Sequence, residues 1–410
     1  MPECDPLLHI SAAPPPPVGT LWSSVFALLS TMLGAGILSL PATMASVTVV
    51  PDIFLFVAVA SLTYITCHAC FLAASFTGQH SYETVAATLF GPTRQWFVRL
   101  LTLVKLFGVL AVFVVVAMDM LHPFVATIAS RPVVGIALTA FTLPFCLTDT
   151  LYALRHTNAV VVGCVLYTFV VVAVRAAMVV AWPATSNVSG HDDPPSSFAH
   201  NLALALPVQA MSFGCQINSV RIYGELVDKS LMPAVNGWSL VFGFVFYVAF
   251  SLFGFVCFQG FPPPDILMGF ATDDWLVNSV RLALGVSMVL KIPLLYQPFF
   301  EVVHAIATTS TKPSALQTPA LPAPTAGFRI TAAVLTLAMT CATAIAFKNL
   351  SVIMGFMGAT GSILFNVCVP GMFLVEVGVG SQSSQTKYFG VTLVVAGLAM
   401  STASLVGLLT

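Results

Sequence analysis

Uncharged apolar stretches recur along the whole chain and are separated by short polar segments. A helix needs about 20 apolar residues to cross the hydrocarbon core of a bilayer, and eleven stretches come close to or exceed that length. The pattern therefore predicts an all-α polytopic membrane protein with eleven transmembrane helices. The expected spans are residues 21–47, 53–77, 96–121, 132–148, 158–182, 201–223, 236–259, 275–303, 328–347, 350–377 and 387–409.

The composition agrees with this class. Of the 410 residues, 58% are hydrophobic and 7% are charged, whereas soluble domains carry about 25% charged residues. A water-soluble globular protein is therefore excluded, and the lipid bilayer is the expected surrounding. The 14 basic and 15 acidic side chains leave no basic surplus for a nucleic-acid partner. The nine cysteines show neither zinc-ligand spacing nor a disulfide framework, so we expect no metal and no cofactor.

The distribution of Lys and Arg indicates an orientation. With the N-terminus in the cytoplasm, eight of these residues in the loops face the inside and two, Arg131 and Lys348, face the outside, as the positive-inside rule requires. The same topology places residues 183–200 in an extracellular or lumenal loop, where Asn187 begins a glycosylation sequon. Residues 1–20 contain a proline run and no basic residue, so we expect a disordered cytoplasmic head. The host membrane, plasma membrane or vacuolar/lysosomal, stays open.

Two of the predicted spans are interrupted near their middle. Gly34, Ala35 and Gly36 interrupt the first span, and residues 212–216 interrupt the sixth. Inverted-repeat transporters break one helix in each half near the midplane, although small residues also occur where helices simply pack closely. The spacing predicts a five-plus-five architecture, in which residues 21–182 form the first repeat, 201–377 the second, and 378–410 contain the eleventh span.

The freed backbone groups at such breaks suit a zwitterion. Amide N–H groups at a half-helix N-terminus favour a carboxylate, whereas carbonyl oxygens favour an ammonium. We therefore expect an α-amino acid to bind between the two breaks. The candidate binding residues there are Gly34, Ala35, Gly36, Ile37, Phe213, Gly214, Cys215 and Gln216.

At these positions the chain resembles the amino acid/auxin permease family of the APC superfamily, which includes vacuolar and sodium-coupled neutral amino acid transporters. Residues 31–41, TMLGAGILSLP, resemble the first helix of that family. The resemblance implies a LeuT-type fold, amino acid transport, and first and sixth helices unwound around the substrate. It also implies a side-chain pocket lined by Phe107, Leu110, Ala111, Phe213 and residues 357–362. Further matches are residues 106–109, Asp119, 153–157, 222–226 and 358–362.

The chain departs from the sodium-coupled members at their coupling positions. It has Ser30 where they carry Asn, and Lys291, two residues before Pro293, where they carry Thr. The Cys-His pair of their sixth helix becomes Cys215 and Gln216, which removes a titratable imidazole. A lysine deep in a span is costly and usually functional. We therefore expect Lys291, with Ser30 and Thr31, to form the coupling site.

The hypothesis is that the ammonium of Lys291 occupies the place of sodium and contacts carbonyls of residues 30–33. Loss and gain of its proton would make the carrier proton-coupled, whereas a lysine that never titrates would make it sodium-independent. A static lysine with a purely structural role is the alternative. At the ends of the spans, Asp119 is a candidate outer gate paired with Arg281 or Arg175, and Glu225 is a candidate cytoplasmic gate.

The predicted function is secondary active transport of amino acids by alternating access. Neutral substrates are favoured because no acid falls mid-membrane in the third, sixth, eighth or tenth span, although Asp119 leaves a cationic substrate open. No catalytic motif is present, so we do not expect an enzyme. The alternatives are a sodium-coupled or uncoupled carrier, or an amino acid sensor of the same fold.

Overall fold

The described part of the chain is almost entirely helical. The computed structural model describes residues 19–147, 157–181, 197–309, 324–347 and 349–409. Most of the predicted head, the sequon at Asn187, Lys348 and most of the 153–157 motif lie outside these residues. Within them the β-structure is one isolated bridge between Gly19 and Leu226. The predicted all-α class is confirmed.

Two helices of the sequence are broken into shorter pieces, and the rest are mostly long. The helices are α1 (Leu21–Met32), η1 (Ala35–Ser39), α2 (Leu40–Val47), α3 (Val49–Thr77), α4 (Tyr82–Val125), α5 (Arg131–Cys146), α6 (Thr157–Ala181), α7 (Phe198–Ser212), α8 (Gln216–Glu225), η3 (Lys229–Leu231), α9 (Met232–Cys257), η4 (Ile266–Gly269), α10 (Trp275–Thr309), α11 (Ala326–Ala346), α12 (Leu350–Met357), the π-helical η5 (Gly358–Cys368), α13 (Val369–Gly380) and α14 (Ser384–Leu409).

In the described residues, eight helices are long and apolar enough to cross a membrane, and α1 with η1 and α2, bent by 53°, would make nine. The other two predicted spans fall on α5, which has 16 residues, and on the pair α7 and α8, which have 15 and 10. Helix length therefore does not establish the predicted count of eleven. The sixth span is divided into two helices that are each too short to cross a membrane, because the residues between them are unwound.

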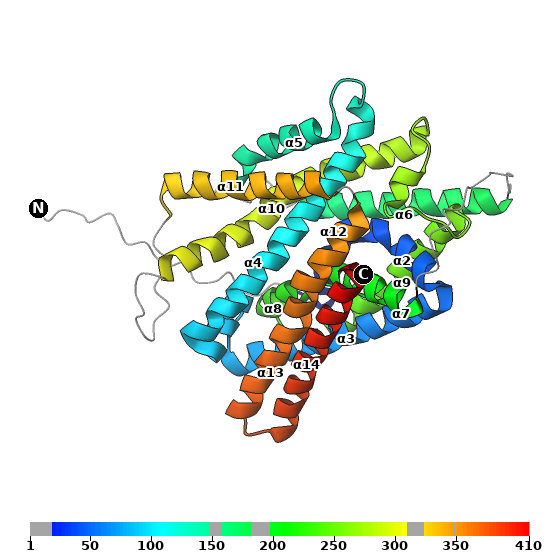
Figure 1. Ribbon diagram of the computed structural model, residues 1–410. Helices are drawn as coiled ribbons and strands as arrows, with labels where there is room; N and C mark the ends of the chain where they lie inside the picture. Colours follow the sequence, from blue (N-terminus) through cyan, green and yellow to red (C-terminus); the bar gives the residue numbers. More distant parts are fainter. Residues whose placement is uncertain (1–18, 148–156, 182–196, 310–323, 348, 410) are drawn as a thin grey trace, which may run out of the picture.

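The helix α4 lies at the centre of the bundle. It crosses the middle of the view in Figure 1, packs most extensively against α10, and also contacts η5 and α5. In the most apolar stretch of this helix 72% of the residues are buried, whereas the corresponding value for α14 is 28%. The helices α13 and α14 lie side by side at the periphery (Figure 1). The broken helices pack between α3, α9 and η5, so the two breaks are held inside the protein.

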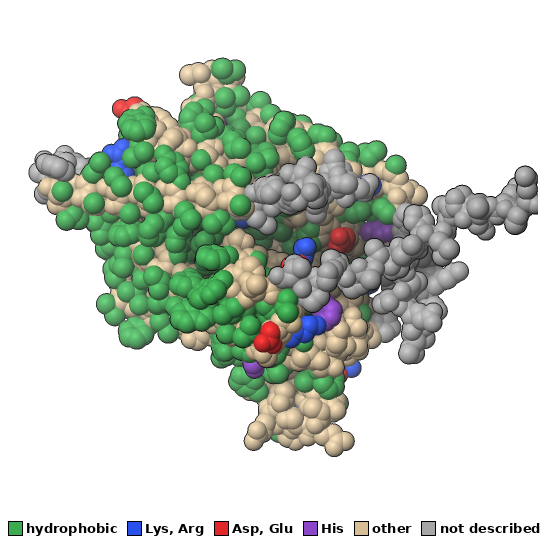
Figure 2. All heavy atoms as spheres, turned by 180° about the vertical axis from the view of Figure 1, so that it is seen from behind, with side chains coloured by type: hydrophobic (Ala, Val, Ile, Leu, Met, Phe, Trp, Pro, Cys, Tyr) green, Lys and Arg blue, Asp and Glu red, His purple; other side chains and the backbone are tan. Residues whose placement is uncertain are grey.

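The outer surface is dominated by apolar side chains. Hydrophobic atoms cover most of the face in Figure 2, and large side chains such as Phe54 and Phe26 are 71% and 65% exposed. A monomer in water rarely exposes so large an apolar area, whereas lipid tails solvate it. Together with the long apolar helices, this surface shows an integral membrane protein.

Glycine at position 358 allows α7 and η5 to pack closely. A Cβ at Gly358 would lie 2.3 Å from the carbonyl oxygen of Pro207. We expect Gly358→Ala to destabilise the protein by about 1–3 kcal/mol, because a backbone oxygen has no alternative rotamer and the helices must move apart. Gly163→Ala on α6 is the matched control, since nothing lies within 4 Å of its Cβ. Thermal unfolding in detergent measures the difference, and equal melting temperatures would contradict it.

Candidate functional site

The first break separates α1 from η1. Leu33 leaves the helix with ψ 96°, and Gly34 is extended, so the axis bends by 53°. No side chain caps η1 at Gly34. The first amides of a helix have no intrahelical acceptor. The amides that follow Gly34 are therefore available to an external acceptor, at the interruption that the sequence predicts.

The second break separates α7 from α8. Ser212 ends α7, Gln216 begins α8, and Phe213, Gly214 and Cys215 lie between them. The amides of Phe213 and Gly214 turn back to carbonyls of α7. Cys215 precedes α8 without a side-chain cap. This break therefore repeats the polarity of the first, with a carbonyl end followed by an amide end.

The two breaks touch each other through Tyr247 of α9. Its hydroxyl lies 2.6 Å from the carbonyl oxygen of Met32 and 2.9 Å from that of Ser212, and its one proton is shared between them. The side chain is fully buried. A Cβ at Gly36 would lie 2.5 Å from Oγ of Ser212, so glycine there permits the close approach. Sequence reasoning missed Tyr247, although a tyrosine in an apolar span needs a polar partner.

The side chains of the predicted binding residues at the second break pack into the interior. The ring of Phe213 lies edge-on to those of Tyr247 and Phe56, with centroids 4.9 and 6.3 Å apart. The side-chain amide of Gln216 donates through Nε2 to the hydroxyl of Thr66 at 3.0 Å. Cys215 lies with its Sγ 3.6 Å from Sγ of Cys67. These side chains therefore fix the break, and its backbone is the part available to a ligand.

The first-span candidates are placed differently from one another. Ala35 and Ile37 are buried, whereas Gly34 and Gly36 are partly accessible. Phe107 lies on α4, partly buried against the hydrophobic core. The structure thus brings residues 34–37 and 212–216 together around Tyr247, and Phe107 belongs to the neighbouring helix.

Lys291 of α10 points at the end of α1. Its ammonium lies 3.5 Å from the carbonyl oxygen of Leu33, a long hydrogen bond, and 5.8 Å from the ring centroid of Phe113. The side chain is buried, and no carboxylate of the described residues lies within 4.0 Å of it. The hydroxyls of Ser30 and Thr31 donate to the carbonyls of Ala27 and Leu28 within α1, so the observed contact of Lys291 with this helix is to the main chain at Leu33.

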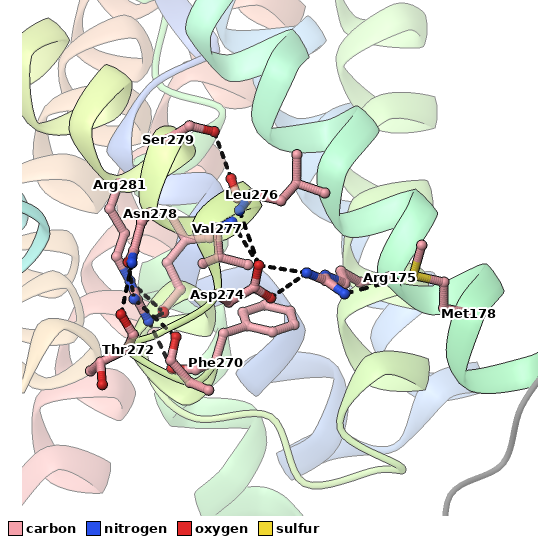
Figure 3. A network of polar contacts seen from close by, with 12 residues as sticks. Arg175, Met178, Phe270, Thr272, Asp274, Leu276, Val277, Asn278, Ser279 and Arg281 are labelled. Atoms are coloured by element: carbon pink, nitrogen blue, oxygen red, sulfur yellow. Dashed lines mark hydrogen bonds and ion pairs between the residues drawn. The ribbon is translucent and has the colours of Figure 1, made fainter.

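The predicted partners of Asp119 are wrong. Asp119 accepts from Arg131 at 2.6 Å, and Arg131 also donates to the carbonyl of Ala344. Arg175 of α6 and Arg281 of α10 instead bind groups of the loop between α9 and α10, as Figure 3 shows. Arg175 pairs with Asp274 at 2.5 Å, and Arg281 donates to the carbonyls of Leu267 and Phe270 and to Asn278. The loop supplies carbonyl acceptors that the sequence pattern does not reveal.

Comparison with known proteins decides the family. The model of the family described as "Transmembrane amino acid transporter protein" matches residues 17–410. The chain belongs to this family.

Its relatives include the amino acid transporter AVT6B of Arabidopsis thaliana, with 27% identity over 303 residues, which cover 67% of this chain and 66% of that protein. The putative sodium-coupled neutral amino acid transporter 11 of Danio rerio is 23% identical over 288 residues, covering 66% and 62%. The sodium-coupled neutral amino acid transporter 7 of Xenopus laevis is 23% identical over 299 residues, covering 67% and 63%. The match thus spans slightly less than two thirds of the length of these relatives.

A solved structure extends the likeness to the fold. The crystal structure of MhsT in complex with L-phenylalanine superposes with a TM-score of 0.60 at 10% identity, covering 96% of this chain and 100% of that one. This family member therefore has the LeuT-type fold that the family resemblance implies.

The chain that enters α1 of this transporter-family protein is tied to the end of α8. The amide of Gly19 donates to the carbonyl of Glu225 at 2.9 Å, and the amide of Val227 donates to the carbonyl of Gly19 at 3.1 Å. The Glu225 carboxylate is exposed and pairs with Arg221 at 3.3 Å. The main chain of Glu225, rather than its carboxylate, therefore joins the ends of the two broken spans.

At the start of α2, the loop between α9 and α10 contacts the first broken span. The hydroxyl of Ser39 donates to the carbonyl of Pro264 at 2.8 Å. Next to it, Asp265 accepts from the amide of Leu267 at 3.0 Å, while its other oxygen is buried with no partner among the described residues. Burial, with a smaller contribution from the negative charge of Asp119, raises the pKa of Asp265 to about 7. This carboxyl is therefore largely protonated in mildly acidic conditions.

We expect Tyr247→Phe to lower the stability of the protein. The change leaves two buried carbonyls, those of Met32 and Ser212, without their donor, and each such group costs about 1–3 kcal/mol. Tyr388→Phe on the exposed surface of α14 is the control. Thermal unfolding in detergent compares the two variants. A Tyr247→Phe protein as stable as the control would show that the hydroxyl does not hold the breaks.

Asp265 makes stability depend on pH. Its folded pKa lies above the unfolded value of 3.8, so the folded state binds the proton more tightly and stability falls as the pH rises from about 4 through 7. At pH 8 the unfavourable contribution reaches up to about 4 kcal/mol. We therefore expect Asp265→Asn to be more stable than wild type at pH 8, by a margin in melting temperature that narrows as the pH is lowered toward 4.

The control for this effect is Asp228→Asn in the exposed loop after α8. Hydrogen bonds from Ser230 hold the pKa of Asp228 below its usual value, so its substitution should not raise stability at pH 8. An equal gain from both variants would point to general charge reduction instead of the buried carboxyl.

Proposed function

We propose that this protein is a secondary active transporter that moves amino acids across a membrane by alternating access. The observation that carries the proposal is the pair of breaks in the first and sixth spans, joined at Tyr247. The names of the relatives, and the L-phenylalanine in complex with MhsT, support amino acids as the substrate class.

The substrate would be held by main-chain groups. The free amides at the start of η1 suit its carboxylate, and the carbonyls of Phe213 and Gly214, which follow α7, suit its ammonium. Phe107, Leu110 and Ala111 of α4, with residues 357–362, would line the side-chain pocket. In this scheme the residues of the two breaks and Phe107 are the substrate-binding set, and no cofactor takes part.

A neutral substrate fits the distribution of buried acids. Among the described residues, the buried aspartates engage other groups: Asp52 accepts from Gln209, Asp119 from Arg131, and Asp265 from the amide of Leu267. None of these hydrogen bonds involves residues 34–37 or 213–216. A cationic side chain would therefore find no ready counter-charge at the breaks.

Lys291 would replace the coupling sodium ion. The C-terminal end of a half-helix carries partial negative charge and attracts a cation. The ammonium of Lys291 already lies at that end, 3.5 Å from the carbonyl of Leu33, and its charge would repel a sodium ion from the same place. Release and uptake of its proton during the cycle would couple transport to a proton gradient. Ser30 and Thr31 have no direct role in this scheme.

The N-terminus would lie on the cytoplasmic side of a plasma membrane or of a vacuolar/lysosomal membrane, with Asn187 on the opposite side. In this orientation the link between Gly19 and Glu225 lies at the inner ends of the broken spans, and the pair of Asp119 and Arg131 lies near the outer side. Both would open in turn as the site alternates between the two faces.

Uptake of a radiolabelled amino acid mixture into proteoliposomes tests the proposal. Wild type, Lys291→Met and Lys291→Arg are compared under an inward proton gradient and under a sodium gradient. We expect proton-driven, saturable uptake by wild type that falls at least about tenfold in Lys291→Met, because the coupling group is lost. Lys387→Met, at an exposed position of α14, is the control and should transport like wild type.

The contrary outcomes separate the parts of the proposal. Sodium-driven uptake, unchanged by Lys291→Met, would overturn the role of Lys291 and leave amino acid transport standing. Saturable binding without uptake would indicate a sensor of the same fold.

A further inference from the structure

Lys105 is a second buried lysine in the core of the bundle. It lies on α4, and its ammonium donates to Oδ1 of Asn366 at 2.7 Å and lies 4.5 Å from the ring centroid of Phe365. The side chain is 8% exposed, and no carboxylate of the described residues lies within 4.0 Å of its Nζ. A buried ammonium without an anion is costly, so its polar contact to Asn366 needs an explanation.

Asn366 connects the lysine to the second break. Its Nδ2 donates to the carbonyl oxygen of Ala210 at 3.3 Å, in the last turn of α7, where a helix leaves its carbonyls without intrahelical donors. Gly214 leaves room for the amide, because a Cβ there would lie 2.8 Å from Nδ2 of Asn366. Asn366 itself lies in the π-helical η5, and such segments occur frequently at functional sites. The chain of contacts therefore runs from α4 through η5 to the end of α7.

The two lysines make corresponding contacts at the two breaks. Lys291 comes from the eighth predicted span and reaches a carbonyl at the end of α1. Lys105 comes from the third predicted span and reaches, through Asn366, a carbonyl at the end of α7. In a five-plus-five repeat the third span corresponds to the eighth and the first to the sixth. Each half-helix end is thus joined, directly or through Asn366, to a lysine from the equivalent span of the other half.

Among the described residues, no charged side chain forms an ion pair with Lys105. The titratable groups that face it are the thiols of Cys67 and Cys70 on α3 and of Cys215 at the break. Tyr82 stacks on the other contact of the lysine, Phe365, with ring centroids 4.8 Å apart. Asn366 is therefore the group that connects the ammonium to the broken helix.

We propose that Lys105 is a positioning residue of the second break, which holds the end of α7 in place through Asn366 and limits how fast that break opens. This role rests on the proposed function only for its effect on transport, because the opening itself is a property of the free protein.

Alkylation of the native Cys215 by N-ethylmaleimide measures that opening without any substrate. Cys215 is 1% exposed, so it reacts only when the break opens. Asn366→Ala keeps the lysine charge and removes the connection, whereas Lys105→Met removes both. We expect each variant to raise the labelling rate of Cys215 at least about fivefold, and the double variant to raise it no further, since all of them cut one chain of contacts. Lys105→Arg should label like wild type.

Cys341 on α11, which is 5% exposed, is the internal control, and Lys387→Met is the control variant. Unchanged labelling of Cys215 in both Asn366→Ala and Lys105→Met overturns the proposal. Faster labelling of Cys341 to the same extent also overturns it, because that result means general loosening of the fold. Peptide mass spectrometry distinguishes the two cysteines.

Uptake assays add the transport arm. If the wild type transports amino acids, Asn366→Ala and Lys105→Met should change the maximal rate and leave KM within about twofold, because the substrate contacts remain. A rise in KM with an unchanged maximal rate would overturn the positioning role. Absence of uptake by wild type would refute the proposed function and leave the labelling result as the test of Lys105.

Discussion

The hydroxyl of Tyr247 is the contact on which the arrangement of this protein depends. Breaking a helix inside a membrane frees backbone carbonyls and amides, and each costs several kcal/mol if it finds no partner there. Tyr247 lies between the carbonyls of Met32 and Ser212 and so supports both breaks at once. The breaks are tolerated because side chains of neighbouring helices take over the hydrogen bonds that the helices have lost.

Buried polar side chains elsewhere in the bundle follow the same rule. Lys291 donates a hydrogen bond to the carbonyl of Leu33, and Arg281 donates to carbonyls of the loop that precedes α10. Gln209 donates to the buried Asp52 of α3. These side chains connect separate helices across the apolar interior. In a chain with 7% charged residues, most of the buried charges of the described part are thus engaged with backbone or with one another.

The sequence predicts those features that depend on local composition. The apolar stretches give the helices, and Gly34 and Gly36 inside one of them give the first break. Contacts between distant residues could not be predicted in this way. Tyr247 is one of several aromatic residues in an apolar span, and nothing in its neighbours shows that it meets Met32, 215 residues away. Lys105 and Asn366 are 261 residues apart. The pair of Asp119 and Arg131 is 12 residues apart, but the pairing depends on how the turn between α4 and α5 folds.

The role of Lys291 is best measured as proton movement when an amino acid is added to proteoliposomes that contain a pH-sensitive dye and no sodium. We predict that substrate acidifies the interior of vesicles with wild type, and that Lys291→Met vesicles show no substrate-dependent change. Acidification that persists in Lys291→Met, or uptake that appears only with sodium, would contradict the assignment of Lys291 as the built-in cation.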